Sequence, residues 1–307
     1  MKRREFITKT ITAGLAAGTA LKLGGFSTLW AAEPAGSAKP YDLVAVRNGE
    51  PEVMFDRAIE SLGGMSKYVK RGQTVVVKPN IGWDVSVERA GNTNPGLVKS
   101  IVEHCFKAGA KDVYVFDNTC DLWTNCYSNS GIEAAAKSAG AKVVTGNSER
   151  KYRDVQIPGA ETLKTVKVHE LILDSDVFIN VPVLKHHSSA RVTVAMKNLM
   201  GIVWDRRYWH QNNLQKCIAE FAALRKPDLN VVDAYRVMTR NGPRGVSEAD
   251  VSLMKQLLVS PDIVAIDAAS TKIFGSEPGD IPYIVMAHEM GIGTMNLQTL
   301  SINRITL

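Results

Sequence analysis

Clustered cysteines are missing from this chain of 307 residues. Its four cysteines form no CxxC pair, so the thiolate pattern of an iron–sulfur cluster is absent. Cys105 and Cys217 fall in segments with amphipathic helical periodicity, where a buried thiol is the simplest interpretation. Cys120 and Cys126 lie in a polar stretch and are candidates for a disulfide only in an oxidising compartment. The cysteine pattern argues against an iron–sulfur cofactor and leaves any other cofactor unknown.

Common nucleotide-binding and hydrolase motifs are also missing. No GxGxxG follows an expected strand, and neither a phosphate-binding P-loop nor a GxSxG nucleophile elbow occurs. A dehydrogenase with a dinucleotide cofactor, a P-loop NTPase and a serine hydrolase are therefore disfavoured.

The chain lacks a strong charge of one sign. Apolar residues make up 45% of it and charged residues 22%, which is ordinary for a globular protein and excludes a mainly disordered one. The net charge is +6, and five basic and two acidic residues within the first 38 account for half of it. The remainder is too small, without interleaved aromatic residues, to indicate nucleic-acid binding.

The N-terminus has no charge-free run of the roughly 20 residues that a membrane-spanning helix needs, because Lys9 and Lys22 interrupt it. The adjacent Arg3 and Arg4, followed by Phe6 and a weakly hydrophobic Gly/Ala/Thr-rich stretch, resemble a twin-arginine export signal. We therefore expect recognition by the twin-arginine export machinery, a periplasmic or extracytoplasmic location and no stable membrane span. A retained membrane anchor is the alternative.

Residues 1–38 are the expected signal peptide and linker, and residues 39–307 the expected single α/β domain. Small residues suited to cleavage occur near Ala31 and Ala32 and again at residues 36–38, and the sequence does not distinguish the two places. The twin-arginine route carries proteins that are already folded, often with a cofactor inserted. An exported oxidoreductase is therefore a candidate partner.

Strands alternate with helices along the rest of the chain. We expect strands at residues 41–46, 74–77, 112–116, 142–145, 177–181, 229–232 and 300–305, with a less regular strand-like region at 155–168. We expect helices at residues 52–62, 95–108, 132–139, 214–224, 250–257, 263–274 and 283–287. This alternation is typical of parallel strands joined by helical crossovers. The predicted fold class is therefore α/β, a doubly wound, mainly parallel sheet with helices on both faces.

Polar side chains directly follow four of the expected strands. They are Lys78 and Asn80, Asp117 and Asn118, the run Lys185 to His187, and Asp233. Ligands of doubly wound sheets bind beyond the carboxyl ends of the strands. The sequence therefore predicts that these four groups converge on one site.

The densest group of polar residues lies in the stretch VFINVPVLKHHSSARVTVAMKNLMG, residues 177–201. An apolar strand stops at Pro182 and leads into what we expect to be a polar loop that includes Arg191. Lys185 and Lys197, with Lys78 from another strand, are placed to surround a carboxylate or phosphate. Close cations lower one another's pKa, which makes a neutral lysine base conceivable. A solvated basic loop is the alternative.

Imidazoles and amides supply the other candidate roles. His187 is the expected general acid or base, and its neighbour His186 points the other way if the two lie on a strand. Asn80 and Asn198 are expected to orient the ligand, and Asp233 to set a protonation state. His187 and His210 are the metal ligands if a metal is bound, completed by Asp205 or Asp233, although their spacing matches no standard zinc pattern.

Two further segments are candidates for contact with a ligand. WDRRYWH, residues 204–210, is either a lid that stacks over a planar ligand or a loop that its two tryptophans anchor. The turn NGPRG, residues 241–245, brings backbone amides near a ligand at Gly242.

Six motifs, in order, resemble the family catalogued as domain of unknown function 362. They are VVVKPNIG (75–82), VFINVPVLKHH (177–187), VTVAMKNLMG (192–201), His210, VVDA (231–234) and GPRG (242–245), so the similarity runs from about residue 74 to 274. Many members carry a ferredoxin-like segment with clustered cysteines, which this chain lacks. The resemblance places ten residues at motif positions without assigning roles to them: Lys78, Asn80, Lys185, His187, Lys197, Asn198, His210, Asp233, Gly242 and Pro243.

The leading hypothesis is an exported α/β protein that binds a small anionic molecule at the carboxyl edge of its sheet and transforms it. Lys78, Lys185 and Lys197 form the expected electrostatic clamp. A non-catalytic binding protein with the same pocket is one alternative. A metal-binding or redox accessory protein for an exported oxidoreductase is the other.

Overall fold

The computed structural model describes residues 29–30 and 40–307. The expected signal peptide and linker, residues 1–38, lie outside the described residues apart from Leu29 and Trp30.

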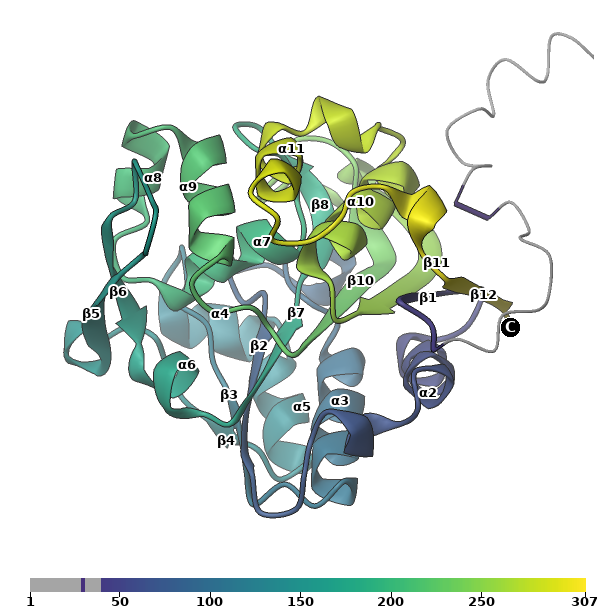
Figure 1. Cartoon of the computed structure of the whole chain (residues 1–307). Coiled ribbons are helices and arrows are strands. Elements are labelled where there is room, and N and C mark those ends of the chain that lie inside the picture. The colour runs from purple at the N-terminus through teal and green to yellow at the C-terminus, as the bar shows by residue number, and fades with distance from the viewer. Residues whose placement is uncertain (1–28, 31–39) are drawn as a thin grey trace, which may run out of the picture.

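One ten-stranded sheet forms the centre of the molecule (Figure 1). Its main path runs in the order β12-β1-β11-β10-β7-β2-β3-β4, and the hairpin β8-β9 joins it through β10. The strands are β1 Leu43–Arg47, β2 Thr74–Pro79, β3 Asp112–Val115, β4 Lys142–Val143, β7 Val177–Val181, β8 Val183–His187, β9 Arg191–Thr193, β10 Leu229–Met238, β11 Val251–Ser260 and β12 Ile302–Thr306. A separate antiparallel pair is formed by β5 Tyr152–Gln156 and β6 Thr165–His169.

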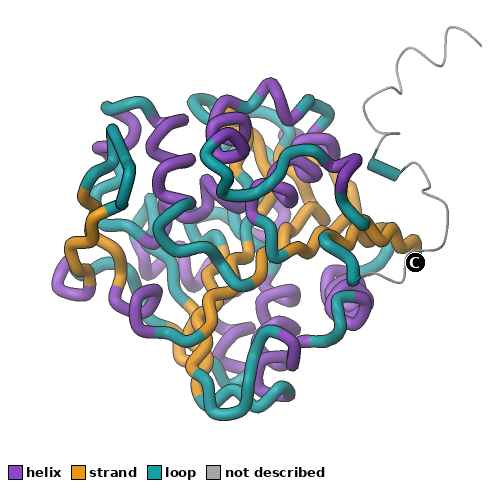
Figure 2. Tube along the Cα trace, in the orientation of Figure 1, coloured by secondary structure: helices purple, strands orange, loops and turns teal. Residues whose placement is uncertain are grey.

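Helices cover both faces of the sheet, as the flanking helical segments of Figure 2 show. The longer ones are α2 Pro51–Ser61, α3 Pro95–Lys107, α4 Trp123–Asn129, α5 Ile132–Ser138, α9 Leu214–Ala222, α10 Ile263–Phe274 and α11 Pro282–Glu289. The shorter ones are α6 Glu170–Asp174, α7 Ala195–Asn198 and α8 Arg207–Gln211. None of the helices formed by the described residues is long and apolar enough to cross a membrane.

The two faces bury separate hydrophobic cores. Val75 and Val77 of β2 pack into the core under α2, α3 and α5, whereas Val76 between them packs into the core under α7, α9, α10 and α11. This alternation follows from the two-residue period of a strand. Most strand pairs are parallel, including those that join β2 to β3 and β7. The predicted fold class is therefore confirmed.

Two helices begin at the caps that their sequences indicate. The Asn94 side chain accepts hydrogen bonds from the backbone N–H groups of Gly96 and Leu97, and Pro95 occupies the first turn of α3. Asp262 caps α10 in the same way. Such caps satisfy N–H groups that have no partner inside the helix.

The helix predicted at residues 250–257 is wrong, because this segment is strand β11. Its apolar residues recur at the spacing of a helix, at Leu253, Met254, Leu257 and Leu258. The segment nevertheless pairs antiparallel with both β10 and β1, and its C-terminal half is buried. Pairing on both sides outweighs the weak helical pattern.

The polar loop predicted after Pro182 is also wrong, because residues 183–193 form the hairpin β8-β9. Short runs interrupted by His186, His187 and two serines carry too little periodicity to be recognised as strands. The hairpin holds the side chains of Lys185 and His187 on one face, since alternate residues of a strand point the same way.

Candidate functional site

A pocket of about 460 Å³ lies beyond the carboxyl ends of β2 and β3, next to the hairpin β8-β9 and the short helices α7 and α8. Seven of the nine site residues predicted from the sequence line it: Lys78, Asn80, Lys185, His187, Lys197, Asn198 and His210. Strands β2 and β8 supply Lys78, Lys185 and His187, and Asn80 directly follows β2. Helices α7 and α8 supply Lys197, Asn198 and His210. The site therefore combines the carboxyl edge of the sheet with the short helices beside it.

Lys78 is held by an ion pair in the interior. Its Nζ lies 3.0 Å from Oδ1 of Asp117 and donates to Oδ1 of Asn198 at 2.9 Å. The other carboxylate oxygen of Asp117 accepts from the backbone N–H of Ile81 at 2.7 Å. Burial lowers the pKa of Lys78 and raises that of Asp117, and their attraction opposes both shifts. The pair as a whole is neutral, whichever partner holds the proton.

Gly201 packs against this ion pair. A Cβ atom at this position would collide with both Oδ1 of Asp117 and Nζ of Lys78. The glycine therefore allows the backbone after α7 to approach the pair closely.

Lys185 is equally buried but has no carboxylate partner among the described residues. Its Nζ donates to Oδ1 of Asn80 at 3.1 Å and to the carbonyl oxygen of Gly91 at 2.5 Å. Burial, assisted by the positive charge of Lys197, lowers the pKa of Lys185 to about 7. A large fraction of Lys185 is therefore the neutral amine near neutral pH.

Lys197 has the poorest set of acceptors. Its side chain is buried, and its Nζ lies 2.9 Å from the thioether sulfur of Met200. A thioether is a weak acceptor. Burial, with Arg206 and Lys78 nearby, lowers the pKa of Lys197 to about 8. At pH 7 this side chain remains mainly an ammonium ion without an anionic partner in the described structure.

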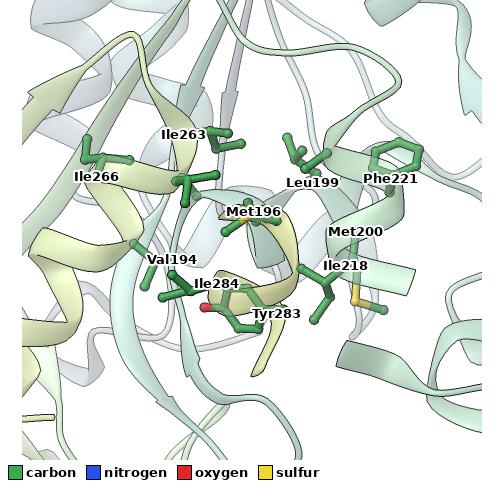
Figure 3. Packing of buried hydrophobic residues seen from close by; sticks show 14 of the residues in the cluster. Val194, Met196, Leu199, Met200, Ile218, Phe221, Ile263, Ile266, Tyr283 and Ile284 are labelled. Atoms are coloured by element: carbon green, nitrogen blue, oxygen red, sulfur yellow. The ribbon is translucent and has the colours of Figure 1, made fainter. Parts of the chain in front are cut away.

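Helix α7 holds Lys197 and Asn198 in place through its opposite side. The buried carboxylate of Asp267 accepts from the backbone N–H groups of Ala195 (2.7 Å) and Met196 (3.2 Å). Met196 and its neighbours pack against residues of α9, α10 and α11 (Figure 3). Burial raises the pKa of Asp267 to about 8. The anchor is therefore internal and leaves the lysine free to face the pocket.

A chain of four asparagines runs from the pocket into the core. Lys185 donates to Asn80, Asn80 to Asn198 (2.8 Å), Asn198 to Asn180 (2.9 Å) and Asn180 to Asn230 (3.0 Å). The Asn230 amide donates to the carbonyl oxygen of Ser260 at 3.3 Å. Every donor points away from Lys185, so the bonds polarise one another in the same sense. This direction fixes the Oδ1 atom of Asn80 toward the Lys185 amine.

His187 is fixed by the turn that follows it. Its Nδ1 accepts from the backbone N–H groups of Ser189 (3.1 Å) and Ala190 (3.2 Å), which places the proton of the neutral ring on Nε2. Burial, with Lys197 and Lys185 nearby, lowers the pKa of His187 to about 2. The ring is neutral near pH 7, so it offers the pocket an N–H donor instead of an imidazolium acid.

The segment 204–210 is anchored by its tryptophans. Trp209 is buried and lies 5.1 Å from the ring of Phe221, and Trp204 lies 5.3 Å from Tyr152. Arg206 and His210, between and after them, line the pocket. Of the two interpretations of this segment, the anchored loop fits the contacts.

Arg206 and His210 reach the pocket from this anchored segment. The Arg206 guanidinium donates to the carbonyl oxygens of Asn118 (2.7 Å) and Thr119 (2.6 Å), which ties the segment to the loop after β3. The His210 ring stacks on that of His187, with centroids 6.2 Å apart and planes at 14°. Burial lowers the pKa of His210, so this second imidazole also favours its neutral form.

Asp233 and Gly242 do not line the pocket. Both carboxylate oxygens of Asp233 accept backbone N–H groups, from Asn94 at 2.8 Å and Tyr235 at 3.0 Å, and burial raises its pKa to about 6. Gly242 packs on His186, whose Nδ1 accepts the Gly242 N–H at 3.0 Å. His186 thus points away from the pocket, as expected for the strand neighbour of His187. Asp233 therefore stabilises the N-terminus of α3, where Asn94 is the N-cap residue.

No group of three or more His, Cys, Asp or Glu side chains suited to a metal ion occurs within residues 40–307 or at residues 29–30. His187 and His210 are the two imidazoles that line the pocket. Since Nδ1 of His187 already accepts two N–H groups, one of its nitrogens is available to any ligand.

Several residues that shape the pocket do not follow from the sequence patterns above. Asp117 follows an expected strand, but no pattern pairs it with Lys78, and none assigns a role to Thr193 or Arg206. Asn180 and Asn230 do carry a signal in the sequence, since each interrupts an apolar, buried strand. A polar residue in such a strand requires a hydrogen-bond partner, and the partners here lead to the site.

The family model described as "Domain of unknown function (DUF362)" matches residues 75–272. The chain belongs to this family. The resemblance expected from the six motifs is therefore confirmed. All seven pocket-lining residues named above fall within the region that the DUF362 model matches.

The sequence identity to individual proteins is low. A thylakoid-associated protein of Synechocystis sp. is 27% identical over 242 residues, which cover 76% of this chain and 73% of that protein. The lactate racemase apoprotein from Thermoanaerobacterium thermosaccharolyticum matches with a TM-score of 0.47 and 11% identity, over 77% of this chain and 58% of that one. A protein from Thermotoga maritima matches with a TM-score of 0.43 and 11% identity, over 60% and 51%. This DUF362 chain thus spans less than two thirds of either solved structure.

Proposed function

We propose that the pocket binds a small anionic ligand, a carboxylate or a phosphate, and transforms it. The observation that carries this proposal is Lys197, a buried ammonium that lines the pocket and donates to the thioether sulfur of Met200. A buried charge without a partner costs several kcal/mol. An anion bound beside Lys197 offsets part of this cost, so the pocket favours anionic ligands over neutral ones.

The surrounding side chains have complementary roles in this proposal. Lys197 and Arg206 attract the anion, and the Nε2–H group of His187 donates to one of its oxygens. The Asn80 amide holds Lys185 in position. Lys185, as a neutral amine, takes a proton from the ligand or attacks it.

Binding is tested through Trp83, which lines the pocket. We expect inorganic phosphate or acetate to change the tryptophan fluorescence in a saturable way, and the change to disappear in Trp83→Phe. Lys197→Met should weaken binding at least about tenfold, the loss expected when a charge-assisted hydrogen bond is removed. Lys111→Met, at an exposed lysine that precedes β3, is the matched control and should bind normally.

Equal affinity in Lys197→Met and the unaltered protein would refute the proposal. Recovery of a bound compound unchanged after long incubation, with affinity intact in His187→Gln, would instead support the non-catalytic binding protein.

We also propose that the protein is exported by the twin-arginine route, with residues 39–307 as its folded domain. The motif of Arg3 and Arg4 followed by Phe6 supports this. A reporter fused after residue 38 should reach the periplasm, and replacing both arginines by lysine should retain it in the cytoplasm. Export that is unaffected by this double substitution would exclude the route.

A further inference from the structure

The Lys185 amine has one bonding direction left for a ligand. Its Nζ is tetrahedral: one direction is the bond to Cε, and two point to acceptors, Oδ1 of Asn80 and the carbonyl oxygen of Gly91. The fourth direction carries the third proton in the ammonium form and the lone pair in the amine form. Because Lys185 lines the pocket, this direction is the one that a bound molecule can use.

The asparagine chain keeps the amine in this orientation. Asn80 is held by Asn198, which in turn is held by Asn180. Both Asn198 and Asn180 are buried. The acceptor at Asn80 therefore cannot turn away without breaking hydrogen bonds in the core.

A second unused group faces the same space. Thr193 lies directly opposite Lys185 in the β8-β9 pair, so the two side chains are on one face of the hairpin. Its hydroxyl is buried, 4% of the residue being exposed, and has no hydrogen-bond partner within the described residues, although Thr193 lines the pocket. Buried hydroxyls are rarely left unpaired. This one is placed to bond an oxygen of a ligand that also reaches Lys185.

We propose that Lys185 forms a Schiff base with a 2-oxo acid, whose carboxylate is held by Lys197 and Thr193. This rests on the proposed function, because it assigns the anion to a carboxylate and adds a neighbouring carbonyl group. Lys78 is unsuited to the same role, since an aspartate and an asparagine already engage its Nζ.

The step is balanced without an oxidant or reductant. The lone pair of Nζ adds to the carbonyl carbon, and the π electrons of the carbonyl move to its oxygen, which takes the proton released from nitrogen. The resulting carbinolamine loses its oxygen as water, with one further proton taken up, and leaves a protonated imine. The Nε2–H group of His187 donates to the departing oxygen. The iminium ion then withdraws electrons from the adjacent carbon.

The electrostatics of the pocket support this reactivity. The pKa of Lys185 is lowered to about 7, chiefly by burial and with a contribution from Lys197. An ordinary lysine has a pKa near 10.4, so Lys185 holds on the order of a thousandfold more free amine at pH 7.

Reductive trapping tests the inference. The purified protein is incubated at pH 7 with cyanoborohydride and, in turn, pyruvate, 2-oxobutyrate and 2-oxoglutarate, and the modified lysine is located by peptide mass spectrometry. We expect at least one of these acids to label Lys185 far more than any other lysine. The label should vanish in Lys185→Met, persist in Lys111→Met and decrease in excess lactate, which has the carboxylate but a hydroxyl in place of the keto group.

The outcomes separate this inference from the proposed function. Oxo acids that change Trp83 fluorescence but leave Lys185 unlabelled would overturn the Schiff base and leave anion binding intact. Labelling spread evenly over exposed lysines would also overturn it. If phosphate, acetate and the oxo acids all fail to affect Trp83, the proposed anion site fails as well.

Discussion

Lys78 and Lys197 lie in the same pocket and are both buried, yet their surroundings differ. Nζ of Lys78 has a carboxylate oxygen at 3.0 Å and an amide oxygen at 2.9 Å, whereas Nζ of Lys197 donates to a thioether sulfur. The first lysine completes a neutral unit of the folded protein. The second keeps a charge that the described structure does not balance. The comparison separates a lysine that stabilises the fold from one that is available to a ligand.

The largest effect is expected from breaking the balanced pair. Lys78→Met leaves the buried carboxylate of Asp117 without its cation, which should lower the free energy of unfolding by about 3–5 kcal/mol. Denaturant titration measures this loss. The double variant Lys78→Met/Asp117→Leu should recover much of it, because both charges are then absent. A loss below about 1 kcal/mol in the single variant would show that the pair does not stabilise the fold.

Removing Lys197, the lysine without an anionic partner, should change the free energy of unfolding in the opposite direction. The lowered pKa of Lys197, about 8, corresponds to a destabilisation of about 3 kcal/mol at neutral pH. We expect Lys197→Met to raise the free energy of unfolding by about 1–3 kcal/mol while it weakens anion binding. A gain of stability with a loss of binding is typical of functional residues. A variant that is both less stable and a normal binder would contradict the distinction between the two lysines.

The asparagine chain connects Lys185 with Asn198, the acceptor of Lys78. Breaking it should change the free energy of unfolding by an intermediate amount. Asn180→Ala removes the acceptor of Asn198 and the donor to Asn230, and unpaired buried amides cost about 1–3 kcal/mol. Both stability and ligand affinity should fall, because Asn198 also positions Asn80. Asn147→Ala, at an exposed asparagine, is the control. If affinity is unchanged in Asn180→Ala, the chain contributes to the fold but not to the site.

Much of the pocket could be predicted from the sequence, because its residues follow buried strands. Lys78 and Asn80 lie at the edge where parallel strands present their carboxyl ends, as the rule for ligand sites in doubly wound sheets predicts. Lys185 lies in the same pocket, but on strand β8 instead of in the expected loop. The sequence does not show which side chains pair: Lys78 lies on β2 and Asp117 follows β3, and no local pattern connects the two. For the same reason Asp233, which also follows a strand, was expected in the site but instead binds backbone N–H groups beside α3.

The errors in the fold have a related cause. Segment 250–257 has a local spacing that favours a helix, but its place between β10 and β1 makes it a strand. The hairpin β8-β9 was missed because each strand is too short to show a period. In both cases the decisive interactions join residues that are distant in sequence, so local patterns carry little information about them.

The smallest expected effect is a difference in pH dependence between the unaltered protein and Lys197→Met. The pKa of Lys197 is about 8 in the folded protein and near 10.4 when unfolded, so between these values the unfolded state binds more protons. Stability due to this group therefore rises with pH, by about 1 kcal/mol between pH 7 and pH 9. Lys185, whose pKa Lys197 helps to lower to about 7, contributes to this difference in the same direction, because the loss of Lys197 relieves Lys185 more at pH 7 than at pH 9. Buried cysteines and Asp267 also titrate, but their contributions are common to the two proteins and cancel in the difference. We expect the stability gain of Lys197→Met to shrink by that amount over this range. A gain that stays constant from pH 7 to pH 9 would mean that Lys197 has an ordinary pKa, and its ammonium would then be balanced by a partner, which would remove the contrast with Lys78.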